Sequence, residues 1–355
     1  MNEAIKTALA QVEQAHKPAG SVPWEADTPF PQPIYTYKVS THSWEPSPSP
    51  TDPGPLIPAI PLPQALTGLA VFSWNVDFMV PHPRARMEAA LSALQTLILS
   101  LPAAVAAVVF LQECLPADLE TIGATGWVRA AFRRTDVGDA FWASGHYGTT
   151  TLVDRRLGVA GVFRAHYGQT RMERDALFVD VLFPPASEGE GEDEGGKERK
   201  ERTVRLCNTH LESLASDPPF RPAQAAIAAK FMHDEAVDGA ILAGDLNAIQ
   251  PFDRTLHSAH GLEDAYLALG GAEDSEAGYT WGQQAAPELR ALFGCSRMDK
   301  VWYCGRVAAR RFERFGADVE VEDDGAREEI MRWGGFEKGW VTDHLGVFAE
   351  FSFED

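Results

Sequence analysis

Five short polar motifs are spread along the chain, and most of them directly follow an apolar run of the kind that forms a strand. Packed strands that end in this way would deliver Asn, Glu, His and Asp side chains to one edge of a sheet. The first and last motifs lie far apart in the sequence, so one domain must hold both ends together. In chain order the motifs are Trp74-Asn75-Val76, Leu111-Gln112-Glu113, Asn208-Thr209-His210-Leu211-Glu212-Ser213, Gly244-Asp245-Leu246-Asn247 and Thr342-Asp343-His344.

The apolar pattern predicts strands alternating with helices. Residues 84–101 have helical spacing and lie between two strand candidates, residues 69–75 and 105–112. This β-α-β order favours a fold of layered sheets and helices. Further strand candidates are residues 157–163, 176–183, 203–208, 240–243, 297–303 and 346–353, and residues 222–233 form a second long helix candidate.

Composition limits the classes of protein that the chain can belong to. It has 355 residues, 45% hydrophobic and 23% charged, which is ordinary for a globular protein. The net charge of −20 counts against tight binding along a duplex, but less against an enzyme that grips one chain end and lets Mg²⁺ neutralise the phosphate. The cysteines form no CxxC pair, and neither a signal peptide nor an apolar run of membrane-spanning length is present. We therefore expect an intracellular monomer, nuclear and/or cytoplasmic, without a membrane span.

Two segments differ in composition from the rest of the chain. Residues 3–16 could form a short amphipathic helix, and residues 18–63 hold 13 of the 24 prolines. Aromatic residues within this second segment favour a strap packed on the domain over a free tail. Residues 185–202 are rich in Glu, Gly, Lys and Arg, which predicts a solvated hairpin loop or a disordered insertion. We divide the chain into residues 1–67, the N-terminal helix and strap, and residues 68–355, the catalytic domain.

The polar motifs supply metal ligands and acid–base groups. Glu113 ends an apolar strand and could hold Mg²⁺ or Mn²⁺; taken alone, a solvated strand-end acid is the better interpretation. Asp245 could take a proton from water or orient it, and the Asn247 amide could hold the phosphate or the nucleophile. His344 could stabilise a pentacovalent phosphorane or act as the base, and Asp299 could orient its ring. His210 is the weaker of the two histidine candidates, because a lone histidine is more often structural.

Other residues are candidates for substrate contact, with equally good structural alternatives. Tyr147 and Arg174 could bind phosphate, or they could be a core tyrosine and a surface arginine. Trp281 could offer a face for stacking, or it could be buried packing. Walker A, Rossmann, zinc-protease and Gly-x-Ser-x-Gly motifs are absent from the sequence.

Several segments resemble the endonuclease/exonuclease/phosphatase superfamily, and the likeness spans about residues 69–353. His-Leu-Glu-Ser, residues 210–213, narrows the likeness to the tyrosyl-DNA phosphodiesterase branch. The resemblance implies a four-layered, DNase I-like α/β sandwich of two packed sheets flanked by helices, with the active site at one end. The other segments that carry it are residues 72–77, 110–113, 242–247, 279–281, 297–301 and 342–346.

The resemblance also implies roles for individual residues. Glu113 would be the Mg²⁺ (or Mn²⁺) ligand, with Asn75 and Asp343 beside it. Asp245 and Asn247 would lie at the nucleophilic water, with Asp343 and His344 around the scissile phosphate. The side chains that align with phosphate-contacting or substrate-wall positions are Tyr147, Arg174, His210, Ser213 and Trp281.

The expected function is therefore metal-dependent hydrolysis of a phosphodiester at a nucleic-acid 5′ end. A 5′-phosphotyrosyl-DNA bond, as in DNA repair, is the best single substrate. The alternatives are an enzyme of the same superfamily that acts on RNA ends, a phosphoinositide or another phosphoester, and a binding module that kept the fold without the chemistry. Three features depart from the pattern: Gly282 after Trp281, the proline-rich strap and the acidic insertion.

Overall fold

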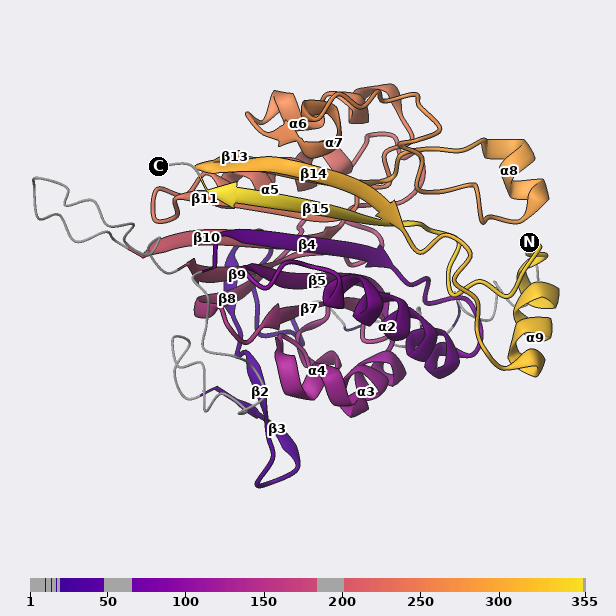
Figure 1. Ribbon diagram of the computed structural model, residues 1–355. Coiled ribbons are helices and arrows are strands. Elements are labelled where there is room, and N and C mark those ends of the chain that lie inside the picture. The colour runs from indigo at the N-terminus through magenta and orange to yellow at the C-terminus, as the bar shows by residue number, and fades with distance from the viewer. Residues whose placement is uncertain are drawn as a thin grey trace, which may run out of the picture.

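The computed structural model describes residues 20–47, 66–183 and 201–353, together with Ala10, Gln14 and Lys17. Within these residues two β-sheets pack face to face, and helices cover their outer faces (Figure 1). The prediction of a four-layered α/β sandwich is confirmed. The expected helix at residues 3–16 lies outside the described residues except for Ala10 and Gln14, which are helical, and the insertion lies outside them up to residue 200.

One sheet has eight strands, and two adjacent inner strands carry the first two polar motifs. These strands, β4 and β5, are parallel and buried along their whole lengths, as continuous apolar sequence predicts. The strand order is β14-β15-β4-β5-β7-β6-β2-β3. The bounds are β14 Val307–Phe315, β15 Gly346–Phe353, β4 Gly68–Asn75, β5 Val105–Cys114, β7 Gly148–Asp154, β6 Phe132–Arg134, β2 Tyr35–Lys38 and β3 Ser43–Pro46.

The other sheet has seven strands and carries the next two motifs on a second parallel pair, β10 and β11. In their register His210 lies beside Asp245, and Asp245 lies beside Asp299 on the antiparallel strand β13. The strand order is β1-β8-β9-β10-β11-β13-β12. The bounds are β1 Pro29–Pro31, β8 Gly158–His166, β9 Asp175–Phe183, β10 Arg202–His210, β11 Gly239–Asp245, β13 Asp299–Gly305 and β12 Glu263–Asp264.

Three apolar clusters hold the layers together. The first lies between the sheets, the second packs α2, α3 and α9 on the eight-stranded sheet, and the third packs α5 on the seven-stranded sheet. In the described chain no helix is long and apolar enough to cross a membrane. The α-helices are α2 Pro83–Leu99, α3 Pro116–Ala124, α4 Gly126–Ala131, α5 Arg221–Met232, α6 Leu256–Ala259, α7 Ala265–Ala268, α8 Pro287–Phe293 and α9 Asp324–Gly334; the 3-10 helices are Asp139–Phe141 and Pro251–Arg254.

Residues 20–47 of the strap lie against the rest of the molecule. Strand β1 pairs with β8 in one sheet, and β2 pairs with β6 in the other. The Trp24 ring stacks on His166 with a centroid distance of 3.9 Å, and the Trp44 Nε1–H donates to the Gly123 carbonyl at 3.0 Å. These residues therefore contribute strands to both sheets, while the division of the chain at residue 67 stays a prediction.

Candidate active site

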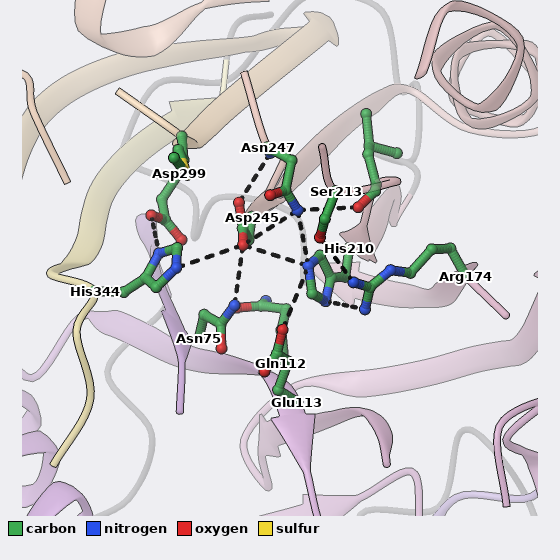
Figure 2. Close-up of polar contacts among 12 residues, drawn as sticks. Asn75, Gln112, Glu113, Arg174, His210, Ser213, Asp245, Asn247, Asp299 and His344 are labelled. Carbon is green, nitrogen blue, oxygen red and sulfur yellow. Dashed lines mark hydrogen bonds and ion pairs between the residues drawn. The ribbon is translucent and has the colours of Figure 1, made fainter. Parts of the chain in front are cut away.

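The polar motifs meet at one edge of the sandwich because of how their strands run. Asn75, His210 and Asp245 are the last residues of β4, β10 and β11. Asp299 begins β13, which is antiparallel to β11, and the segment that enters β15 carries His344. Figure 2 shows the side chains of Asn75, His210 and His344 pointing toward Asp245 from both sheets, while Asp299 points toward the His344 ring.

A single oxygen of Asp245 lies at the centre of the site. Asn75 Nδ2 donates to its Oδ2 at 2.9 Å and Asn247 Nδ2 at 3.4 Å. The imidazole Nε2 atoms of His210 and His344 lie 3.3 and 3.7 Å from the same oxygen. Burial alone would raise the pKa of Asp245, but the charge of His344 and the hydrogen bond from His210 hold this pKa well below its usual range. The arrangement concentrates donors around one anionic oxygen.

His344 is held by one contact on its ring and one on its backbone. Its Nδ1–H donates to Asp299 Oδ2 at 2.8 Å, and Trp74 Nε1–H donates to its backbone carbonyl at 3.0 Å. Burial disfavours a charged ring, but the nearby carboxylates of Asp299 and Asp245 outweigh burial and raise the pKa of His344 well above its ordinary value. The ring therefore directs Nε2 toward Asp245 while Nδ1 is occupied.

Three carboxylates crowd the same end of the cavity: Glu113, Asp343 and Asp77. Burial and repulsion by the other two raise the pKa of Asp77 to about 8. Glu113 Oε2 accepts from the Phe78 backbone N–H at 3.1 Å, and Asp343 Oδ2 accepts from Trp281 Nε1–H at 2.7 Å. Crowded, mutually repelling carboxylate oxygens are the donor set that a hard divalent cation would neutralise, so these residues fit such an ion.

A second cluster of residues could also hold a metal ion. One ligand atom each from Asp245, Asp299 and His344 lie within 4.8 Å of one another in the described chain. The Nδ1 of His344 is already donating to Asp299, however, and Asp245 Oδ2 is surrounded by nitrogen atoms. We therefore favour the Glu113 side of the cavity for a hard cation. Asn75 lies between the two groups, with its Oδ1 accepting from the Asp77 backbone N–H at 2.9 Å.

A cavity of about 750 Å³ opens onto the site. Of the candidate substrate contacts, Ser213 and Trp281 line it. Tyr147, Arg174 and His210 lie behind its wall and are buried. The Tyr147 hydroxyl donates to the Met172 carbonyl at 2.9 Å, and burial raises the pKa of this phenol to about 12.

The sequence interpretation missed two residues here. Asp77 lines the cavity, and its position two residues after Asn75 was the available signal. Arg86, on α2, is buried, and its guanidinium donates to five backbone carbonyls. Two of these, at residues 76 and 341, adjoin the segments that carry Asn75 and Asp343, and no sequence pattern indicates that connection. The accepting residues are Val76, Asp77, Val80, Pro81 and Val341.

Gln112 and Asn208, which also belong to the motifs, have structural contacts in the interior. Gln112 Nε2 donates to Asn208 Oδ1 at 2.8 Å, and Asn208 Nδ2 donates to the Thr150 carbonyl at 2.9 Å. These bonds join β5 and β7 of one sheet to β10 of the other. Not every polar motif residue therefore reaches the cavity.

The fold and this edge of polar side chains define a class of protein. The family model described as "Endonuclease/Exonuclease/phosphatase family" matches residues 72–344, so the chain belongs to this family, whose members are hydrolases acting on phosphoesters and generally depend on a divalent metal. The resemblance inferred from the motifs is confirmed. No curated protein matches the chain.

Solved structures with the same fold include two forms of TDP2. The D. rerio TDP2 humanized by 14 mutations and the TDP2 from C. elegans are each 20% identical to the chain, with a TM-score of 0.56 and 80% of the chain covered; the matches cover 99% and 75% of those proteins. The human Nocturnin catalytic domain with bound sulfate is 16% identical, with a TM-score of 0.51, and the match covers 81% of this chain and 94% of that domain. At these identities the likeness establishes the fold.

Proposed function

We propose that the chain is a divalent-metal-dependent phosphodiesterase that hydrolyses a phosphodiester at a nucleic-acid 5′ end, with a 5′-phosphotyrosyl-DNA bond as its substrate. The observation that carries the proposal is the set of nitrogen atoms around Asp245 Oδ2, next to the His344–Asp299 pair. These nitrogen donors would also attract a phosphoryl group bound in the adjoining cavity, because phosphoryl oxygens are negatively charged, as the Asp245 carboxylate is.

In the proposed mechanism, Asp245 orients the attacking water and takes its proton as the new P–O bond forms, because that bond makes the water acidic enough to protonate even a carboxylate of lowered pKa. The Asn247 backbone N–H donates a hydrogen bond to Asp245 Oδ1 at 2.9 Å, and this bond orients the carboxylate. His344, oriented by Asp299, stabilises the negative charge that develops on the phosphoryl oxygens. Asn75 and His210 would contribute further donors from the other side of Asp245.

The proposed metal ligands are Glu113, Asp343 and Asn75, with Asp77 as a neighbouring carboxylate. Bound Mg²⁺ or Mn²⁺ would polarise the phosphoryl oxygen and stabilise the leaving alkoxide or phenolate. The Phe78 backbone N–H orients Glu113, and the Trp281 indole N–H orients Asp343, through the hydrogen bonds described above.

The cavity suits a substrate with an aromatic part. Its wall includes Trp281 and three partly or largely exposed apolar residues, Ile249, Leu289 and Phe293, so apolar surface adjoins the polar end. A phenolate is also a good leaving group, so a strong general acid is less necessary. Ser213 also lines this wall, and in the proposal its hydroxyl donates to a phosphate oxygen.

The decisive experiment is cleavage of a 5′-phosphotyrosyl oligonucleotide with Mg²⁺, comparing the wild type with Glu113→Ala. Loss of cleavage in the variant, together with loss of Mn²⁺ binding, would support both the activity and the metal site. The matched control is Glu88→Ala, because Glu88 lies on α2 with an exposed side chain. If the wild type is folded and binds metal but does not cleave this oligonucleotide, the proposed substrate is wrong. RNA ends, a phosphoinositide or another phosphoester are then the substrates to test.

A further inference from the structure

Arg174 is enclosed by the protein although it lies close to the cavity. Its side chain is buried, and its guanidinium carbon lies 5.4 Å from the centre of the Tyr147 ring. One terminal nitrogen lies 2.6 Å from His210 Nδ1, and the other donates to Ser213 Oγ at 3.0 Å. These contacts direct the guanidinium to the back of the His210 ring, away from the space where a substrate would bind.

The loop that carries Arg174 is held by a buried carboxylate. Glu212 accepts from the Thr170 hydroxyl at 2.7 Å and from the Arg171 backbone N–H at 2.9 Å. Gln224, on α5, donates to the same carboxylate at 3.2 Å. Thr170 in turn accepts from the Arg174 backbone N–H at 3.0 Å, so the position of Arg174 follows from Glu212.

His210 has a nitrogen donor facing each of its ring nitrogens. Arg174 faces Nδ1, and Asn247 Nδ2 lies 2.9 Å from Nε2. A neutral imidazole has one N–H and one acceptor nitrogen, so it can accept from only one of these neighbours. The Asn247 amide cannot simply be reversed, because its Nδ2 donates to the Leu211 carbonyl at 3.1 Å.

The chemistry of the two neighbours decides which nitrogen carries the proton. A guanidinium has donors but no acceptor, and a hydrogen bond from a charged donor is roughly twice as strong as a neutral one. Nδ1 must therefore accept from Arg174, which leaves the proton on Nε2. Asp245 Oδ2 is then the acceptor for that proton at 3.3 Å, with Glu113 Oε1 at 3.7 Å. The Asn247 N–H groups have the Leu211 carbonyl and Asp245 as acceptors of their own.

We propose that Arg174 is a positioning residue that keeps His210 in the tautomer with its proton on Nε2, and that Glu212 holds Arg174 in place for this task. His210 then presents a permanent hydrogen-bond donor to Asp245, so its effect on catalysis rests on the function proposed for that carboxylate. His210 itself does not serve as the base. Nothing in the sequence motif distinguishes this role from a direct contact between Arg174 and phosphate.

The tautomer can be measured without metal or substrate. In the full chain labelled with ¹⁵N-histidine, NMR distinguishes protonated from unprotonated ring nitrogens, and His210→Gln identifies the signals of His210. The expected wild-type spectrum has Nε2 protonated and Nδ1 unprotonated. A protonated Nδ1 with an unprotonated Nε2 would overturn the proposal, whatever the activity of the enzyme, so this result is independent of the substrate.

Variants test whether Arg174 is the cause. Arg174→Met should give mixed His210 tautomers and lower kcat roughly 10- to 100-fold with little change in KM, as expected for a residue that acts through another. Arg84→Met, at an exposed position on α2, should leave the tautomer and the rate unchanged. An unchanged His210 tautomer in folded Arg174→Met would overturn the role of Arg174. If that variant does not fold, Glu212→Gln should produce mixed tautomers by loosening the loop, and unchanged populations would count against the proposal.

Discussion

Asp245 and Arg86 represent two different uses of a buried charged residue. Asp245 faces the cavity, and nitrogen donors from both sheets surround one of its oxygens. Arg86 is equally buried, but backbone carbonyls receive its donors, so it organises loops without touching the cavity. Charge and burial alone would not separate these roles, whereas the partners do.

Asp245→Asn should lower kcat by about 10²- to 10⁴-fold, because it removes the carboxylate proposed to accept the proton of the attacking water while nearly keeping the side-chain shape. The measurement is turnover of the phosphotyrosyl substrate. Asp324→Asn, at an exposed position on α9 outside the cavity, is the control. Wild-type turnover by a folded Asp245→Asn protein would rule out the mechanism.

Arg86→Met should lower the free energy of unfolding by at least about 3 kcal/mol, because several buried carbonyls lose a charged donor together. Denaturant unfolding measures this change. The fall should be much larger than that for Arg84→Met on the same helix, because the Arg84 side chain is exposed. Equal stability of the two variants would contradict the assignment of Arg86 as a structural anchor.

At the scale of elements, the strap is joined to the sandwich by strand pairing and by aromatic contacts. Trp24 stacks on His166, and His166 Nε2 lies 2.9 Å from the Phe141 carbonyl. The segment that follows Phe141 leads to Tyr147, whose ring stacks on Phe78 at 4.3 Å. The strap therefore adjoins the loop that lies behind the proposed metal-binding end of the cavity.

The stability of this junction should depend on pH. Burial lowers the pKa of His166 from 6.5 to about 4. A lowered histidine pKa contributes stability above pH 6.5, and this contribution is lost as the pH falls toward 4, because the unfolded chain binds the proton first. The loss reaches about 3 kcal/mol. The test is to measure the unfolding free energies of the wild type and of His166→Phe. The advantage of the wild type should shrink as the pH falls from 6.5 toward 4. A difference that stays constant over this range would refute the expectation.

At the scale of the whole molecule, the two sheets are joined by an apolar core and by a polar bridge. The Gln112–Asn208 hydrogen bond crosses between β5 and β10 within that interior, next to the edge that forms the site. This bridge fixes the register of one sheet against the other, because hydrogen bonds are directional and apolar contacts are not.

A double-mutant cycle of Gln112→Leu and Asn208→Leu should give a coupling energy of about 0.5–3 kcal/mol. Each single variant leaves a buried polar group without its partner, whereas the double variant removes both partners of the bond. Denaturant unfolding of the four proteins provides the measurement. Additive effects would show that the bridge contributes no specific coupling between the sheets.

Much of the sandwich was predictable because its central strands are continuous apolar runs. The predicted strands at residues 69–75, 105–112 and 346–353 correspond to β4, β5 and β15. Strand β14 was not predicted. It lies at the edge of its sheet, and charged residues, including the exposed Arg310 and Arg311, interrupt its apolar ones, so its sequence lacks a long apolar run. Edge strands need less apolar surface than central ones, and their sequences therefore give a weaker signal.

The sequence by itself determined the family and the layered fold, and it pointed to most residues of the candidate site, because strand ends and polar motifs are local patterns. Only the tertiary structure decided which side chains face the cavity. It placed Asp77 in the cavity wall and Arg174 behind His210, and it turned Gln112 toward the opposite sheet. The physical reason is that a side chain's partners come from strands far apart in sequence. Burial and hydrogen bonding between those strands, rather than residue type, determine its surroundings.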